Sequence, residues 1–99
     1  MRIEIRPAFD EAVRTAERPI RLAAAKMIVL LQSLDLPQIR THRGLHFEKL
    51  HGMLEPATGE QLYSIRVTRR ARAVTCVVIG PTLVLISLHP QHDRAYRAR

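Results

Sequence analysis

The chain has 99 residues, of which 46% are hydrophobic and 25% are charged, and it carries a formal net charge of +7. This length predicts a single domain over residues 1–99, with a core that needs no disulfides. No apolar stretch approaches the roughly 20 residues that span a bilayer, and the N-terminus lacks the apolar segment of a signal peptide. We therefore expect a cytoplasmic protein with no membrane contact.

The positive charge is concentrated in the part of the chain after Glu60. All basic residues except Lys26 and Lys49 are arginines, and after Glu60 the only acidic residue is Asp93. A field of one sign attracts polyanions through steering and counterion release, and the planar guanidinium suits phosphate. A genome of high GC content would explain the choice of arginine over lysine but not the shortage of acidic residues after Glu60. A nucleic acid or an acidic protein segment is the expected partner.

The first third of the chain predicts a strand and two helices. Residues 1–6 alternate, with Ile3 and Ile5 on one face, which indicates a short strand that ends at Pro7. Residues 8–17 have helical spacing, and Pro19 suits the first turn of a second helix over residues 19–34. The second helix has a wide apolar stripe, which favours packing on a core over a partner surface. The two helices should form a hairpin against a sheet.

The second half predicts that sheet. Residues 62–67, 72–79 and 82–88 are rich in β-branched or aromatic residues, and short links such as Gly80-Pro81 separate them. Short links between adjacent strands predict an antiparallel meander. Residues 38–61 form a long connection that Leu45, Phe47 and Leu50 attach to the core. The expected class is therefore α+β: an N-terminal strand, a helical hairpin, an antiparallel β-meander and a short C-terminal tail.

Cysteine and histidine indicate no metal or redox site. Cys76 is the only cysteine and lies within a predicted strand, where a small buried hydrophobe is expected. The histidines show no HExxH motif and no compact grouping with cysteine or carboxylate ligands. They are His42, His46, His51, His89 and His92. We expect no metal and no cofactor.

The meander offers residues that could form a phosphate site. Alternation along residues 62–67 puts Arg66 on the face opposite Ile65, Arg72 opens the next strand, and His92 follows the last one. Converging arginines stabilise charge on phosphoryl oxygens, and histidine transfers protons near neutral pH. The alternative is a solvated basic face with unrelated histidines.

Several segments together resemble the RelE/ParE toxin superfamily. They are residues 44–52 (Gly-Leu-His-Phe-Glu-Lys-Leu-His-Gly), 62–67, 72–74, 84–89 and 92–96 (His-Asp-Arg-Ala-Tyr), in this order and spacing. The tail resembles the His-Asp-x-Ala-Tyr subgroup, although the tryptophan expected just after it is missing. The resemblance implies a RelE/ParE-like microbial ribonuclease fold and the toxin of a type II toxin–antitoxin pair. For the RelE branch it implies a metal-independent, ribosome-dependent endoribonuclease, in which the messenger's 2′-hydroxyl attacks the adjacent phosphate.

The resemblance also implies roles for individual residues. Arg72 matches a phosphate-binding arginine, Glu48 falls where one branch places a general base, His92 where some members place a catalytic histidine, and Tyr96 near a functional tyrosine. The base is therefore Glu48, His92 or neither. Ser64 stands where the best-known ribonucleases of the family have a second lysine. The expected RNA-binding residues are Lys49, Arg66, Arg69, Arg70 and His89.

The resemblance leaves more than one function open. A RelE-like toxin is expected to have three partners: the ribosome, messenger RNA and a cognate acidic antitoxin. The antitoxin segment would wrap around the toxin and fold as it binds. The ParE branch instead inhibits DNA gyrase without cleaving RNA. A third alternative is a catalytically inactive, nucleic-acid-binding module of the same fold.

Overall fold

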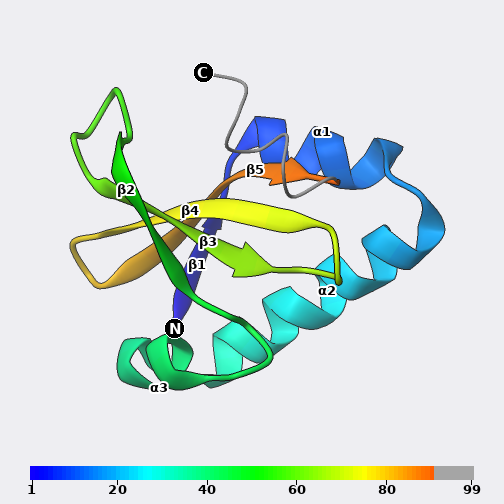
Figure 1. The fold of residues 1–99 in the computed structure, drawn as a ribbon, viewed down its shortest axis with the longest axis horizontal. Helices are drawn as coiled ribbons and strands as arrows, with labels where there is room; N and C mark the ends of the chain where they lie inside the picture. The colour runs from blue at the N-terminus through cyan, green and yellow to red at the C-terminus, as the bar shows by residue number, and fades with distance from the viewer. Residues whose placement is uncertain (91–99) are drawn as a thin grey trace.

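A computed structural model describes residues 1–90 of the chain. In chain order its elements are β1 (Arg2–Ile5), α1 (Pro7–Thr15), α2 (Arg18–Ser33), α3 (Leu36–Thr41), β2 (Glu48–Leu54), β3 (Gln61–Arg66), β4 (Arg72–Val78) and β5 (Thr82–His89). The five strands form one sheet in the order β1-β5-β4-β3-β2 (Figure 1). β1 runs parallel to β5, and the other neighbours are antiparallel. The predicted α+β class, with its N-terminal strand and antiparallel meander, is confirmed.

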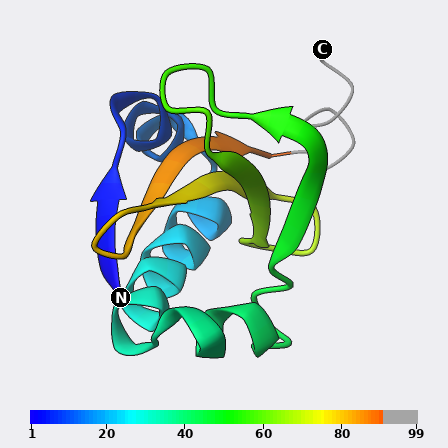
Figure 2. The same ribbon diagram turned by 90° about the vertical axis from the view of Figure 1, so that its left-hand side faces the viewer.

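The helical hairpin covers one face of the sheet, as predicted. Pro7 and Pro19 lie in the first turns of α1 and α2, where a missing N–H removes no helical hydrogen bond. Figure 2 shows β1 and β2 at the two edges of the sheet, with α2 lying across it between them. Phe9, Met27 and Leu31 bring the helices into the main core. Fully burying each such side chain contributes about 1.5–3 kcal/mol. None of the helices within residues 1–90 is long and apolar enough to cross a membrane.

The segment predicted as a connection over residues 38–61 contains two further elements, which is a correction. Asp35 and Pro37 do mark the end of α2, but they also begin α3. The Asp35 side chain accepts a hydrogen bond from the main-chain N–H of Gln38, and the Gln38 side chain accepts one from that of Asp35, both at 2.9 Å. This reciprocal capping box satisfies two N–H groups that a short helix would otherwise leave unpaired.

The second missed element is the edge strand β2. It pairs with β3, so the meander has four strands rather than three, and its register is irregular between Lys49 and Leu54. Gly52 within it has a φ of 75°. A glycine inside a strand is unfavourable and often marks a bulge, so the sequence of this segment does not look like a strand. β2 is a strand because β3 offers it a free edge, not because its own residues favour one.

We expect Asp35→Ala to lower the free energy of unfolding by about 1 kcal/mol, because the helix loses its N-cap acceptor. Asp35→Asn keeps a capping oxygen, so it should lower the free energy of unfolding by only a few tenths of the loss expected for Asp35→Ala. Urea titration of the purified variants measures both. Equal losses in the two variants would show that the carboxylate charge matters rather than the cap.

The sheet curls so that its two edge strands approach each other at one end. Arg6 directly follows β1 and Glu55 directly follows β2, and Arg6 Nη2 lies 3.7 Å from Glu55 Oε1. Glu55 is only 6% exposed. The main-chain N–H of Ala57, at 3.1 Å, is the main reason that the pKa of Glu55 lies below its ordinary value, and Arg6 and Thr58 act in the same direction. Burial opposes this shift without reversing it.

Because the pKa of Glu55 is lowered in the folded state, the contribution of Glu55 to the free energy of unfolding depends on pH. The carboxylate is favoured in the folded state, so its stabilisation is complete above the ordinary value of 4.5 and is lost as the pH falls through the lower, folded value. We expect Glu55→Gln to be less stable than the wild type at pH 7. The two unfolding free energies should converge as urea titrations are repeated below pH 4.5. A gap that stays constant with pH would contradict this assignment.

Candidate functional site

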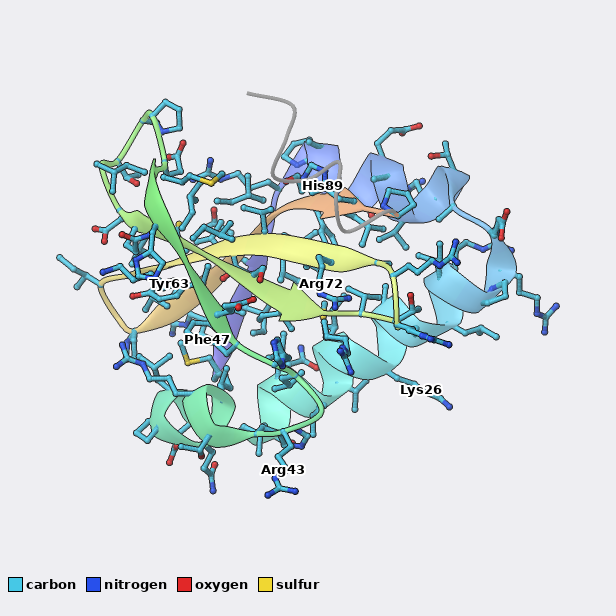
Figure 3. The ribbon with its side chains drawn as sticks, in the orientation of Figure 1. Lys26, Arg43, Phe47, Tyr63, Arg72 and His89 are labelled. Carbon is cyan, nitrogen blue, oxygen red and sulfur yellow. The ribbon has the colours of Figure 1, made fainter. Side chains whose placement is uncertain are left out.

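Three strands bring Arg66 and Arg72, which were predicted to bind phosphate, into one row with His89, which was predicted to bind RNA. Arg66 on β3 pairs with Arg72 on β4, which in turn pairs with His89 on β5. Residues directly opposite each other on neighbouring strands point to the same face of a sheet. We call Arg66, Arg72 and His89 the arginine row. Figure 3 labels Arg72 and His89 on their neighbouring strands.

The arginine row lies on the sheet face away from α1 and α2, which we call the outer face. The alternate residues Ile65, Ala73 and Leu88 belong to the main core with the helices, so the row has the opposite orientation. The next row of this face runs across all four antiparallel strands, as Glu48, Ser64, Val74 and Ser87. The register therefore puts Glu48 on the same face as Arg66.

Part of the outer face is buried, although Glu48 and Arg66 on it are exposed. Several buried apolar residues belong to this face rather than to the main core, as the strand register and alternation show: Leu50, Val74, Cys76 and Val84. Burial raises the pKa of the Cys76 thiol, so the group stays protonated and unreactive. The prediction that Cys76 is a buried small hydrophobe is confirmed.

Arg72 has a structural role that the sequence did not indicate. It is only 6% exposed, and its Nη1 donates hydrogen bonds to the main-chain oxygens of Thr68, Arg69 and Ala71 at 2.9, 3.2 and 3.0 Å. One end of the guanidinium therefore holds the loop between β3 and β4. A phosphate group could therefore accept hydrogen bonds from Arg72 only at its Nε and Nη2 atoms.

Arg66, Glu48 and His89 differ from Arg72 in their surroundings. Arg66 is exposed and forms no hydrogen bond or ion pair with another described side chain. Glu48 is also exposed, with Oε1 3.8 Å from His46 Nε2. His89 is half-buried, and its Nε2 lies 2.9 Å from Ser87 Oγ. A carboxylate, an accessible guanidinium and an imidazole thus share one face; a carboxylate and an imidazole can transfer protons at a phosphodiester, and a guanidinium can stabilise its charge.

From the sequence, His46 was considered only as a possible metal ligand, and it was not predicted to lie beside Glu48. It has a φ of 46°, which is uncommon for a residue other than glycine. Because His46 is two residues before Glu48, this turn brings its ring to the carboxylate. The only available signal was its position in the 44–52 segment, which carries no information about the backbone.

The remaining predicted RNA-binding residues do not join this face. Lys49 pairs with Tyr63, so alternation places it on the face opposite Glu48. Arg69 and Arg70 are exposed in the β3–β4 loop, where they line an open depression of about 580 Å³ with Glu17, Ile20 and Pro90. His92 and Tyr96, predicted as catalytic, lie outside the described residues.

Within residues 1–90, no group of three or more His, Cys, Asp or Glu side chains is placed to hold a metal ion. The four histidines of this region come from different parts of the fold. His42 and His46 flank the turn after α3, His51 is in β2, and His89 ends β5.

No protein-family model and no curated protein matches this sequence. Its structure is similar to RelE in the crystal structure of the archaeal RelE–RelB complex from Pyrococcus horikoshii OT3. The TM-score is 0.67, and the match covers 94% of this chain and 96% of that chain. This chain has the RelE fold. At 17% sequence identity, the likeness confirms the expected fold and leaves the residue roles as predictions.

Strand register gathers the polar residues of these two rows on the outer face of the sheet. In this chain Glu48, Arg66, Arg72 and His89 come from four strands of a single sheet, and the register alone brings them onto one face. The helical hairpin leaves that face free of helices. The RelE-like sheet therefore presents its polar and basic groups on the side that the helices do not cover.

Proposed function

We propose that this protein is the toxin of a type II toxin–antitoxin pair and that it cleaves messenger RNA on the ribosome. The observation that carries the proposal is the common placement of Glu48 and the arginine row on the outer face of a RelE fold. The +7 charge suits both ribosomal RNA and an acidic antitoxin segment. RelE of the similar structure is in complex with RelB, which supports an antitoxin partner here.

The proposed reaction is an intramolecular transfer at one phosphodiester. Glu48 removes the proton of a ribose 2′-hydroxyl, and the resulting oxygen attacks the adjacent phosphorus. Arg66, together with the Nε and Nη2 groups of Arg72 that the β3–β4 loop does not use, stabilises the charge that develops on the phosphoryl oxygens. The bond from phosphorus to the 5′-oxygen breaks, and His92 or Tyr96 returns a proton to that oxygen. The products are a 2′,3′-cyclic phosphate and a 5′-hydroxyl end. We choose Glu48 over His92 as the base because Glu48 is exposed beside Arg66 on the outer face.

One observation favours a second function. Arg72 is mostly covered and is bound to three loop carbonyls. An arginine whose guanidinium is bound to its own loop is less available to a phosphate in a cleavage reaction. This favours a protein that binds nucleic acid or gyrase without cleaving RNA. The two functions predict different fates for cellular messenger RNA.

The test is induction of the protein in a host without the antitoxin, followed by mapping of messenger 5′ ends. Arg66→Ala is the decisive variant, because Arg66 is exposed and its loss leaves the β3–β4 loop intact. Arg18→Ala, an exposed arginine at the start of α2, is the matched control. We expect growth arrest and new in-frame cleavages in the wild type and the control, and neither in Arg66→Ala.

Two results would replace this function with another. Arrest with intact messenger RNA and a DNA-damage response would indicate a gyrase inhibitor. Salt-dependent nucleic-acid binding without arrest would indicate an inactive binding module.

A further inference from the structure

A second depression, of about 420 Å³, lies between the end of α3 and the start of β2. Its lining includes Arg40, His42, Arg43, His46, Phe47 and Glu48. We propose that this depression, the α3 pocket, is an RNA subsite that binds a phosphodiester next to the one cleaved on the outer face. The inference rests on the proposed function, because it extends the same RNA strand beyond Glu48.

The charge of the α3 pocket is suited to phosphate. Arg40 and Arg43 are both exposed, and neither forms a hydrogen bond or ion pair within residues 1–90. Figure 3 places Arg43 just beyond α3 and Phe47 at the base of β2. Glu48 is the only carboxylate in the lining, and its Oε1 lies 3.8 Å from His46 Nε2. Two uncommitted guanidinium groups with their fork geometry are therefore available to an anion.

The loop that forms the α3 pocket is held in place before any ligand binds. The main-chain N–H of Leu45 donates to Nδ1 of His42, and that of His46 donates to the His42 carbonyl oxygen, both at 3.3 Å. Leu45 is only 2% exposed and anchors the loop in the main core. At Gly44 a Cβ would lie 3.1 Å from His42 Cε1, so the loop packs tightly on that ring. A loop that is already ordered loses little entropy on binding.

The α3 pocket is connected to the candidate cleavage site. The main-chain N–H of Arg66 donates to the Leu45 carbonyl oxygen at 2.7 Å, so the pocket loop and the arginine row share a hydrogen bond. Glu48 belongs to both places. Phe47 adds an apolar wall, and its ring is fixed by stacking on Tyr63 with centroids 4.6 Å apart. A strand bound at Glu48 can therefore reach the two arginines of the α3 pocket, because Glu48 lines both places.

The test measures binding of the full chain to a fluorescent octauridylate whose 2′-O-methyl groups prevent cleavage. The variant is the double substitution Arg40→Ala with Arg43→Ala. The matched control is Arg18→Ala with Lys26→Ala, which removes the same charge from exposed positions on α2, where Figure 3 shows Lys26. We expect the pocket variant to bind about tenfold more weakly or worse. Its plot of log affinity against log salt should be shallower by about 0.7 for each phosphate that it no longer binds. The control should change by less than about twofold, since both of its charges are on α2, which packs on the opposite side of the sheet from Arg66.

The outcomes separate the subsite from the function on which it rests. Equal weakening in both double variants would assign the effect to net charge and overturn the subsite. Tight wild-type binding that the pocket variant retains would overturn the subsite alone and leave the proposed function standing. A wild type that binds no free RNA would overturn the subsite, whereas the ribosome-dependent function is decided separately by the mapping of messenger 5′ ends. A deoxyuridylate probe that binds more tightly than the RNA, with the same weakening in the pocket variant, would assign the pocket to DNA and overturn the RNA proposal.

Discussion

Glu48→Gln is expected to slow RNA cleavage by about 10²- to 10⁴-fold, the usual range for removal of a general base. Glutamine keeps the size and hydrogen-bonding ability of the side chain but does not accept a proton at neutral pH. Glu48 is exposed at the start of β2, so its neutralisation should leave folding intact. The measurement is single-turnover cleavage of messenger RNA on programmed ribosomes by the purified variant.

A matched control and a competing variant make this result specific. Glu11→Gln is the same chemical change on the exposed side of α1 and should leave the rate unchanged. His92→Gln tests the alternative base. If Glu48→Gln cleaves at the wild-type rate and His92→Gln does not, the base is His92 and Glu48 has no chemical role. The loss in Glu48→Gln should also persist at saturating ribosome concentration, because it affects the chemical step rather than binding.

Arg72→Ala is expected to lower the free energy of unfolding by about 2 kcal/mol and to abolish cleavage. The variant removes a donor to three main-chain oxygens of the β3–β4 loop and empties a buried position. Two of those oxygens, on Thr68 and Arg69, would regain water, which limits the cost. Urea titration followed by circular dichroism measures the change.

Arg66→Ala separates stability from catalysis in this comparison. Arg66 is the direct cross-strand neighbour of Arg72 but is exposed, so its removal should change the unfolding free energy by no more than about 0.5 kcal/mol. Cleavage should nevertheless fall by about 10²- to 10³-fold, the loss expected for one group that stabilises phosphoryl charge. An unfolding midpoint for Arg72→Ala equal to that of the wild type would contradict the loop-anchoring role.

The strongly patterned elements could be predicted from the sequence to within a few residues. The three predicted meander runs correspond to β3, β4 and β5, and the two predicted helices to α1 and α2. These segments are buried on at least one side, so their apolar spacing records the period of the element. Gly80 also behaves as predicted for a turn, with a φ of 143° and no room for a Cβ beside Thr82 Oγ1.

The elements that were missed carry little pattern of their own. α3 has six residues, and its start signal, Asp35, was assigned only to the end of α2. β2 is an exposed edge strand with histidine and glycine in its middle. Neither stretch is long enough or apolar enough to show a period, and both are stabilised by neighbours that are distant in the sequence.

The sequence by itself determined the fold class, the positive field and the kinds of residue available for a phosphate reaction, because composition and apolar spacing are local properties. Only the tertiary structure decided which of those residues meet. Strand register placed Glu48 on the same face of the sheet as Arg66. It placed Lys49 on the opposite face, since one step along a strand reverses the face. Packing decided that Arg72 is buried and bound to its own loop while Arg66 stays exposed. The physical reason is that register and burial arise from the pairing of one strand with another and from packing against the rest of the fold, which no single segment specifies.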